Sequence, residues 1–183
     1  MIKLQIFFYF FQRAYQLCDS NIFVVLFNDN TPYIQVEECE LNNGLYYLSH
    51  NERKQFKASP AQCFMILDQF PAFRQIVYSG GLQQGSRRIH LGNNLVMSTN
   101  AEDSFKKTVN IRTWYPNKIT DIWYPIRRGI CFKIAELNDF YLVLKELKAG
   151  YWPDLAAITE PACTGEHGCE ICMPNGRSIN FFN

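Results

Sequence analysis

The pattern of apolar positions divides the chain into strands and two helices. Ile22–Phe27 is a run of β-branched and aromatic residues, and Tyr33–Cys39 alternates with Ile34 and Val36 on one face, so both segments are predicted strands. Asn42–Gly44 has the composition of a tight turn and predicts a hairpin into the following LYYL segment. The later strands are predicted at Leu95–Thr99, Thr108–Tyr115, Ile122–Tyr124 and Gly129–Lys133.

Each half of this pattern closes with a helical stripe. Ser59 is a helix cap, Pro60 suits the first helical position, and Gln62 stands where a capping box needs it. Pro71 and Gly150 are expected just beyond the two helices. The first stripe is Cys63, Ile66, Leu67 and Phe70; the second, which lacks a comparable cap, is Ile134, Leu137, Tyr141, Leu144 and Leu147.

The order of elements indicates an internal repeat with a shift of about 74 residues. QLCDSNIFVVLF pairs with HLGNNLVMST, PYIQVEEC with KTVNIRTW, and RKQFKASPAQCFMIL with RRGICFKIAELNDFYLVL. The expected organisation is an N-terminal extension, a first unit, a linker, a second unit and a tail that contains cysteine and histidine. We place their bounds at 1–12, 13–75, 76–85, 86–150 and 151–183.

Composition fits this organisation. The chain has 183 residues, of which 48% are hydrophobic and 19% charged, as expected of a folded globular protein. The apolar run Leu4–Phe11 is about half as long as a membrane span needs. We expect it to be an extra strand or a segment outside the folded unit, rather than a signal peptide, because bulky Arg13, Tyr15 and Gln16 follow it.

The second unit resembles a known family. HLGNNLVMSTN, KTVNIRTWY and PIRRGICFKIAELNDFYLVLKEL are similar to the C-terminal domain of the transcriptional coactivator positive cofactor four. The shared pattern comprises a small-residue turn before a strand, Ile-Arg-aromatic within a strand, a basic pair before Gly-Ile, and a closing helix. The resemblance covers roughly 87–149, and a degenerate copy covers roughly 13–73, supported mainly by the repeat.

The resemblance implies a fold and a function. Each unit would be an antiparallel four-stranded sheet followed by a helix, and two units pair helix to helix in the family to bind single-stranded nucleic acid. We therefore expect an α+β fold of two tandem β-β-β-β-α units packed as an intramolecular pseudo-dimer. By the same resemblance, the protein is expected to bind single-stranded DNA as a nuclear transcriptional coactivator, with RNA, replication and repair left open, and the transcription machinery among its partners.

Alternation in TVNIRTWYP places Arg112 and Trp114 on one face of a strand. We expect both side chains to be exposed, and an exposed cation beside an exposed flat ring suits single-stranded binding, because bases stack on aromatic rings whatever the sequence. The alternative is that Trp114 packs against a neighbouring strand. The full set of predicted binding residues is Arg87, Arg88, Phe105, Lys106, Lys107, Arg112, Trp114, Arg127, Arg128, Arg53 and Lys54.

Charge is unevenly divided between the two units. Residues 86–150 carry eleven Lys and Arg against six Asp and Glu, a net charge of +5, whereas residues 17–70 carry three against seven, a net charge of −4. In the first unit Glu37 stands where Arg112 does, Cys39 where Trp114 does, and Gln55 where Gly129 does. We therefore expect the second unit to bind and the first mainly to support it.

The tail holds the residues for a possible zinc site: Cys163, His167, Cys169 and Cys172. Four such ligands suit tetrahedral zinc, but the spacing is unusual and a single CxxC is a weak signal. The alternative is a cysteine-bearing tail without metal, and the scattered cysteines favour a reducing compartment.

Enzymatic activity is not expected from the motifs. His50, His90 and His167 stand apart from any recognisable nucleophile motif, and the sequence has no phosphate loop or dinucleotide fingerprint. The competing function is a protein-interaction module with weak or no nucleic-acid binding, which the acidic first unit favours.

Overall fold

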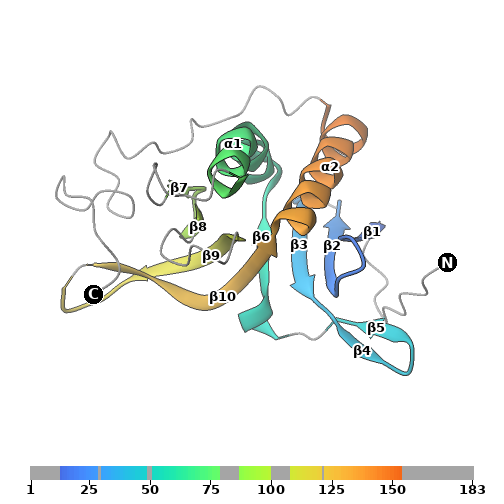
Figure 1. The fold of residues 1–183 in the computed structure, drawn as a ribbon, viewed down its shortest axis with the longest axis horizontal. Helices are drawn as coiled ribbons and strands as arrows, with labels where there is room; N and C mark the ends of the chain where they lie inside the picture. Colours follow the sequence, from blue (N-terminus) through green and yellow to red (C-terminus); the bar gives the residue numbers. More distant parts are fainter. Residues whose placement is uncertain are drawn as a thin grey trace.

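The computed structural model describes residues 13–28, 30–48, 51–78, 87–99, 108–120 and 122–153. Within these ranges the chain forms a mixed α+β fold with antiparallel sheets and two helices (Figure 1). The α+β class expected from the sequence is therefore confirmed. The N-terminal extension and most of the C-terminal tail lie outside the described residues.

The first sheet has four antiparallel strands in the order β1-β2-β3-β6. Its strands are β1 (Arg13–Gln16), β2 (Ile22–Phe27), β3 (Tyr33–Glu38) and β6 (Gln55–Ala58). Between β3 and β6 the chain forms the hairpin β4 (Glu40–Asn42) and β5 (Leu45–Tyr47), followed by the short 3-10 helix η1 (Glu52–Lys54). Asn43 and Gly44 turn this hairpin with φ of 49° and 76°, as the Asn-Gly pair predicts.

The second sheet has the order β10-β9-β8-β7. Its strands are β7 (Arg88–His90), β8 (Leu95–Thr99), β9 (Thr108–Pro116) and β10 (Trp123–Lys133). Two separate strands were expected where β10 lies, at 122–124 and 129–133, and this prediction is wrong. A register shift between Pro125 and Gly129 keeps one long strand paired with β9 while the intervening residues leave the ladder.

Helix α1 (Pro60–Tyr78) begins where the sequence predicts. The hydroxyl of Ser59 accepts a hydrogen bond from the backbone N–H of Gln62, and the Gln62 side chain accepts one from the Ser59 N–H, which completes a capping box. The expected end before Pro71 is wrong, because the helix continues through the proline. Phe73, Ile76 and Val77 are buried beyond it, and their burial offsets the backbone hydrogen bond that a proline removes. The predicted linker, which began at residue 76, therefore starts too early.

Helix α2 (Ile134–Tyr151) follows β10 without a break. The carboxylate of Glu136 accepts a hydrogen bond from the Lys133 backbone N–H at 2.8 Å and so caps the first turn. Gly150 lies within the last turn rather than beyond the helix. The next residue after the helix, Trp152, is buried with its ring 6.3 Å from that of Phe64 on α1.

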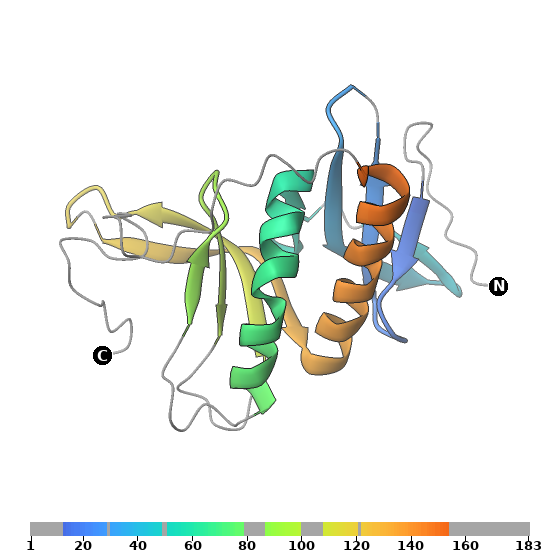
Figure 2. The same ribbon diagram turned by 90° about the horizontal axis from the view of Figure 1, so that it is seen from above.

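Each helix makes polar contacts with the sheet that comes from the other half of the chain. On α1, the Gln62 amide donates to the carbonyl of Gly92 beside β8, and Gln69 accepts a hydrogen bond from the Arg87 guanidinium. On α2, Glu146 accepts from the Tyr15 hydroxyl on β1. Figure 2 shows the same arrangement, with α1 beside β7 and β8 and α2 beside the strands of the first sheet.

One hydrophobic cluster joins both sheets and both helices. Phe56 from the first sheet lies 6.3 Å, between ring centroids, from Phe132 of the second sheet and from Phe140 of α2, and Phe132 stacks on Phe140 at 5.0 Å. The two helices meet through the stacked rings of Phe70 and Tyr141, 4.1 Å apart. The described halves of the chain therefore share a core.

Candidate nucleic-acid interface

The indole of Trp114 lies inside the protein. Only 4% of the residue is exposed, and it packs with Val96 of the neighbouring strand and with partly buried Trp123. The guanidinium carbon of Arg88 lies 5.5 Å from the ring centroid. The prediction of an exposed stacking ring at this position is therefore wrong, and the alternative, packing against a neighbouring strand, is what the structure has. Alternation places a residue on a face but does not reveal what covers that face.

The predicted partner of Trp114 on this strand, Arg112, is half-buried. Its Nε donates to the side-chain oxygen of Asn110 at 3.2 Å. Arg112 lies directly opposite Gly129 on β10, and Glu37 lies opposite Gln55 at the corresponding place in the first sheet. Glu37 is fully buried and accepts a hydrogen bond from Gln35 at 2.6 Å, so its carboxylate does not lie on the surface.

The segment that holds the second basic pair, in β10, packs beside η1, which holds the first. Residues 126–128 leave the ladder at the register shift, so that Arg127 is exposed and Arg128 forms an ion pair with Glu52 of η1. Arg53 follows Glu52 in the same 3-10 helix and is also exposed. We call Arg53, Arg127 and Arg128, together with Glu52, the basic junction.

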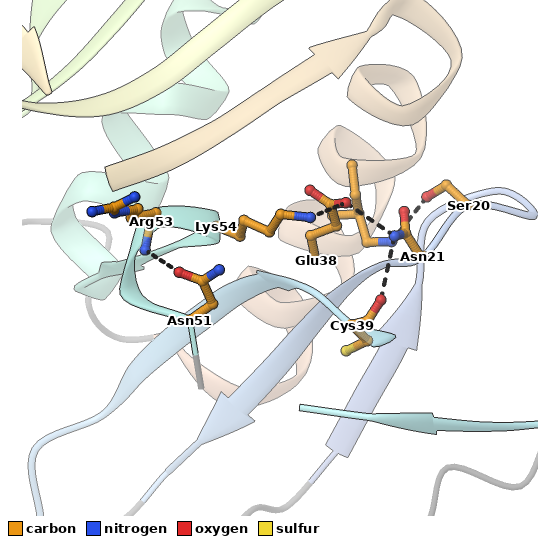
Figure 3. A network of polar contacts seen from close by, with 8 residues as sticks. Ser20, Asn21, Glu38, Cys39, Asn51, Arg53 and Lys54 are labelled. Atoms are coloured by element: carbon orange, nitrogen blue, oxygen red, sulfur yellow. Dashed lines mark hydrogen bonds and ion pairs between the residues drawn. The ribbon is translucent and has the colours of Figure 1, made fainter. Parts of the chain in front are cut away.

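Lys54 belongs to the first basic pair but turns away from the junction. Its ammonium lies 2.9 Å from the Glu38 carboxylate, which also accepts from the side chain of Asn21 at 3.2 Å (Figure 3). Arg53 extends in the opposite direction, while its backbone N–H is held by the Asn51 side chain. The Lys54–Glu38 hydrogen bond raises the pKa of Lys54 and lowers the pKa of Glu38. Lys54 therefore has a carboxylate partner already.

A groove of about 720 Å³ opens beside the basic junction, between the two sheets. One wall comes from β3, β6 and the start of α1, and the other from β8, β9 and β10. The lining is mainly polar and contains two tyrosines, two cations and one carboxylate. Its residues are Tyr33, Gln35, Glu52, Gln55, Phe56, Lys57, Ala58, Ser59, Gln62, Asn93, Leu95, Thr113, Tyr115 and Arg128.

Two features of this groove suit a charged ligand with flat rings. Tyr115 is 46% exposed, next in sequence to the buried Trp114. Lys57 lies with its ammonium 5.0 Å from the centre of the Tyr33 ring, whose plane stacks on Phe27 at 4.7 Å. Neither tyrosine nor Lys57 was among the predicted binding residues. The alternation of QFKA, which sends Lys57 outward beside buried Phe56 and Ala58, was the available signal.

Of the remaining predicted residues, the two that the structure describes, Arg87 and Arg88, do not line this groove. Arg87 bonds Gln69 and lies over the ring of Phe73, and Arg88 lies over Trp114. Phe105, Lys106 and Lys107 lie outside the described residues, as do the candidate zinc ligands Cys163, His167, Cys169 and Cys172. Among the residues that the structure describes, no three Cys, His, Asp or Glu side chains gather as a metal site.

Three of the described thiols, those of Cys18, Cys39 and Cys63, are held in their protonated form. Burial raises the pKa of Cys39 to about 12 and is also the main reason that the pKa of Cys18 rises to about 11. Cys63, on α1, is fully buried and its pKa is raised as well. A thiolate nucleophile is therefore not available at these three positions near neutral pH.

None of the described helices is both long enough and apolar enough to span a lipid bilayer. Comparison of the chain with protein-family models, curated proteins and solved structures finds no match.

Proposed function

We propose that the protein binds single-stranded nucleic acid, DNA in the first instance, at the basic junction and the groove beside it. The observation that carries this proposal is the ion pair that joins Arg128 to Glu52, the neighbour of Arg53 in the other half of the chain, next to a groove with an exposed tyrosine. Cations on such a surface neutralise phosphates, and aromatic rings stack unpaired bases. The role of a nuclear transcriptional coactivator rests on the family resemblance alone.

The strand registers support a duplicated unit that pairs with itself. Val24 lies opposite Val36 in the first sheet as Met97 lies opposite Ile111 in the second. The crossed helix contacts, in which each helix hydrogen-bonds the sheet of the other half, support the proposal of an intramolecular pseudo-dimer. Such a pseudo-dimer would account for the position of Arg53 in the first half beside the Arg128–Glu52 ion pair.

The junction carries more positive than negative charge. Arg127 and the Arg53 guanidinium have no partner among the described residues, whereas Arg128 is paired with Glu52. An exposed ion pair of this kind is weak, so a phosphate can replace the carboxylate. An approaching phosphate therefore meets the exposed guanidinium groups of Arg53 and Arg127, and it can replace Glu52 as the partner of Arg128.

The test is a fluorescence anisotropy titration with labelled single-stranded and duplex oligonucleotides over a range of salt concentrations. We expect preference for the single strand and a linear loss of log affinity with log salt. Arg127→Gln should flatten that slope by about 0.7 and weaken binding about fivefold at 0.1 M salt. Arg53→Gln should do the same, and the two changes together should add.

The matched control is Lys145→Gln, which removes one positive charge from α2, where Lys145 lies over the Tyr141 ring. It should leave the slope unchanged. Equal loss in the control and in Arg127→Gln would mean that net charge alone matters, and the proposed site would be wrong. Absence of single-strand binding by the unaltered protein would overturn the proposed function and favour a protein-interaction module.

A further inference from the structure

We infer that the groove between the sheets receives an unpaired base, stacked on Tyr115, while the phosphates on either side lie on Lys57 and Arg128. This inference rests on the proposed function and assigns the part of the ligand that enters the groove. The groove volume of about 720 Å³ falls within the range of about 300–1,000 Å³ found for small-molecule sites.

Tyr115 has the exposure that a stacking platform needs. It is 46% exposed near the end of β9, and within the described part of the chain no ring or cation lies against it. Base stacking on an aromatic side chain depends on a free ring face and not on base identity. Tyr33 is less suited to this role, because Phe27 lies on one face of its ring and Lys57 lies over it.

The cations stand at different places around the same groove. Lys57 projects from β6, and Arg128 comes from the irregular segment of β10. The ring of Tyr33 holds the Lys57 ammonium 5.0 Å from its centre. Together the two cations can contact successive phosphates of a strand whose base points inward.

Two amide side chains that line the groove, Gln55 and Asn93, are able to contact the edge of a base, because they have no side-chain partner among the described residues. The other two lining amides are already hydrogen-bonded: Gln62 bonds both Ser59 and Gly92, and Gln35 donates to Glu37. An amide offers two donors and one acceptor, which match the exposed edge of an unpaired base.

These features select a single strand over a duplex. Bases of a duplex are stacked and paired within the double helix, and they do not reach a side-chain platform unless they are flipped out. A groove lined by amides, hydroxyls and a tyrosine matches the polar edge and flat face of one unpaired base. The ligand class is therefore an unstructured oligonucleotide with at least one base free to turn inward.

The test compares a labelled thymidine oligonucleotide with an abasic deoxyribose-phosphate strand of equal length and charge. The unaltered protein should bind the thymidine strand more tightly than the abasic strand. Tyr115→Leu should weaken thymidine binding roughly 5- to 150-fold, the range for one lost base stack, and leave abasic binding unchanged. Tyr115→Phe keeps the ring and should bind as the unaltered protein does.

The control is Tyr78→Leu, because Tyr78 is 54% exposed on α1 and does not line the groove. If Tyr115→Leu does not fold, Gln55→Ala replaces it and should weaken binding of the thymidine strand selectively. Equal affinity of the unaltered protein for both strands, or unchanged thymidine binding by Tyr115→Leu, overturns the inference. In either case, weaker binding by Arg127→Gln would leave the proposed function standing.

Discussion

The side chain of Arg112 lies across the backbone of Gly129, its partner on the neighbouring strand. A methyl group on Gly129 would collide with the backbone carbonyl oxygen of Ile111 and come within 2.7 Å of the Arg112 Cα and Cγ. The glycine also has a φ of 147°, a conformation that other residues rarely adopt. Gly129 also ends the irregular segment of β10 that holds Arg127 and Arg128. The glycine of the basic-pair motif is therefore needed because a larger residue would not fit against the neighbouring strand.

Gly129→Ala should destabilise the protein because of the strained backbone angle and because the added methyl group would collide with the Ile111 carbonyl and with Arg112. We expect a loss of about 1–3 kcal/mol in the free energy of unfolding. Urea denaturation followed by circular dichroism measures it. Gly44→Ala is the control: its φ of 76° is also positive, but a methyl group there has no neighbour within 4 Å. An equal loss of stability in both variants would contradict a steric contribution from Ile111 and Arg112.

Glu52→Gln should strengthen single-strand binding, because it removes the carboxylate that pairs with Arg128 at the groove. Freeing one guanidinium should steepen the salt dependence by about 0.7 and raise affinity about fivefold at 0.1 M salt. The titration described above measures both quantities. Asp68→Asn, at an exposed site on α1, makes the same charge change elsewhere and should have little effect.

Trp114→Ala should lower stability rather than remove a binding contact. The indole is 4% exposed, and truncating a buried tryptophan typically costs about 3–5 kcal/mol. Trp114→Phe, which keeps an aromatic ring against Val96, should retain oligonucleotide affinity within about twofold. Thermal denaturation and anisotropy together separate the two effects. A folded Trp114→Phe variant that no longer bound the strand would show that the indole contacts the ligand.

Phe140→Ala should weaken the whole described fold in one step. The ring contacts Phe56 of the first sheet and Phe132 of the second, so its loss opens a cavity between both halves. We expect a decrease of about 3–5 kcal/mol in the free energy of unfolding, with a single transition retained. Two separate transitions, only one of them shifted, would mean that the halves have independent cores.

Acidification should reduce stability through His90. Burial lowers the pKa of this histidine below its ordinary value of about 6.5, so the unfolded chain binds the proton more readily than the folded chain. The stability that the neutral, buried histidine contributes is complete above about pH 6.5 and is lost as the pH falls through the pKa of the folded state. Urea midpoints measured across this range should decline more in the unaltered protein than in His90→Gln. Parallel curves would exclude the histidine as the cause.

Local chemistry explains which elements were predictable. β2 and β8 have the expected limits because β-branched and apolar residues are continuous there, and α1 begins at Pro60 because its cap residues are strong local signals. Tertiary packing decided the rest. Phe73 and Val77 keep α1 helical beyond Pro71, and pairing with β9 joins the two segments predicted at the β10 position into one strand.

The candidate site was predictable only in part. A basic pair can be read from the sequence, but the ion pair of Arg128 with Glu52, the neighbour of Arg53, depends on how the two halves pack. The exposed ring was assigned to the wrong neighbour: Trp114 is covered by Arg88 and Val96, whereas Tyr115, on the opposite side of the strand, is exposed. The alternation of residues separates the two faces of a strand, but it does not show which face is covered by another part of the protein.

The crossed packing of the helices bears on what happens if the chain is severed between Tyr78 and Arg87. Neither fragment would have a complete hydrophobic core. Helix α1 would remain in the fragment with the first sheet, although its Gln62 hydrogen-bonds Gly92 in the other fragment. Folding would then become a bimolecular reaction, with a melting temperature that climbs as the fragments are concentrated. In the intact chain the peptide connection removes that dependence by keeping each half permanently beside its counterpart.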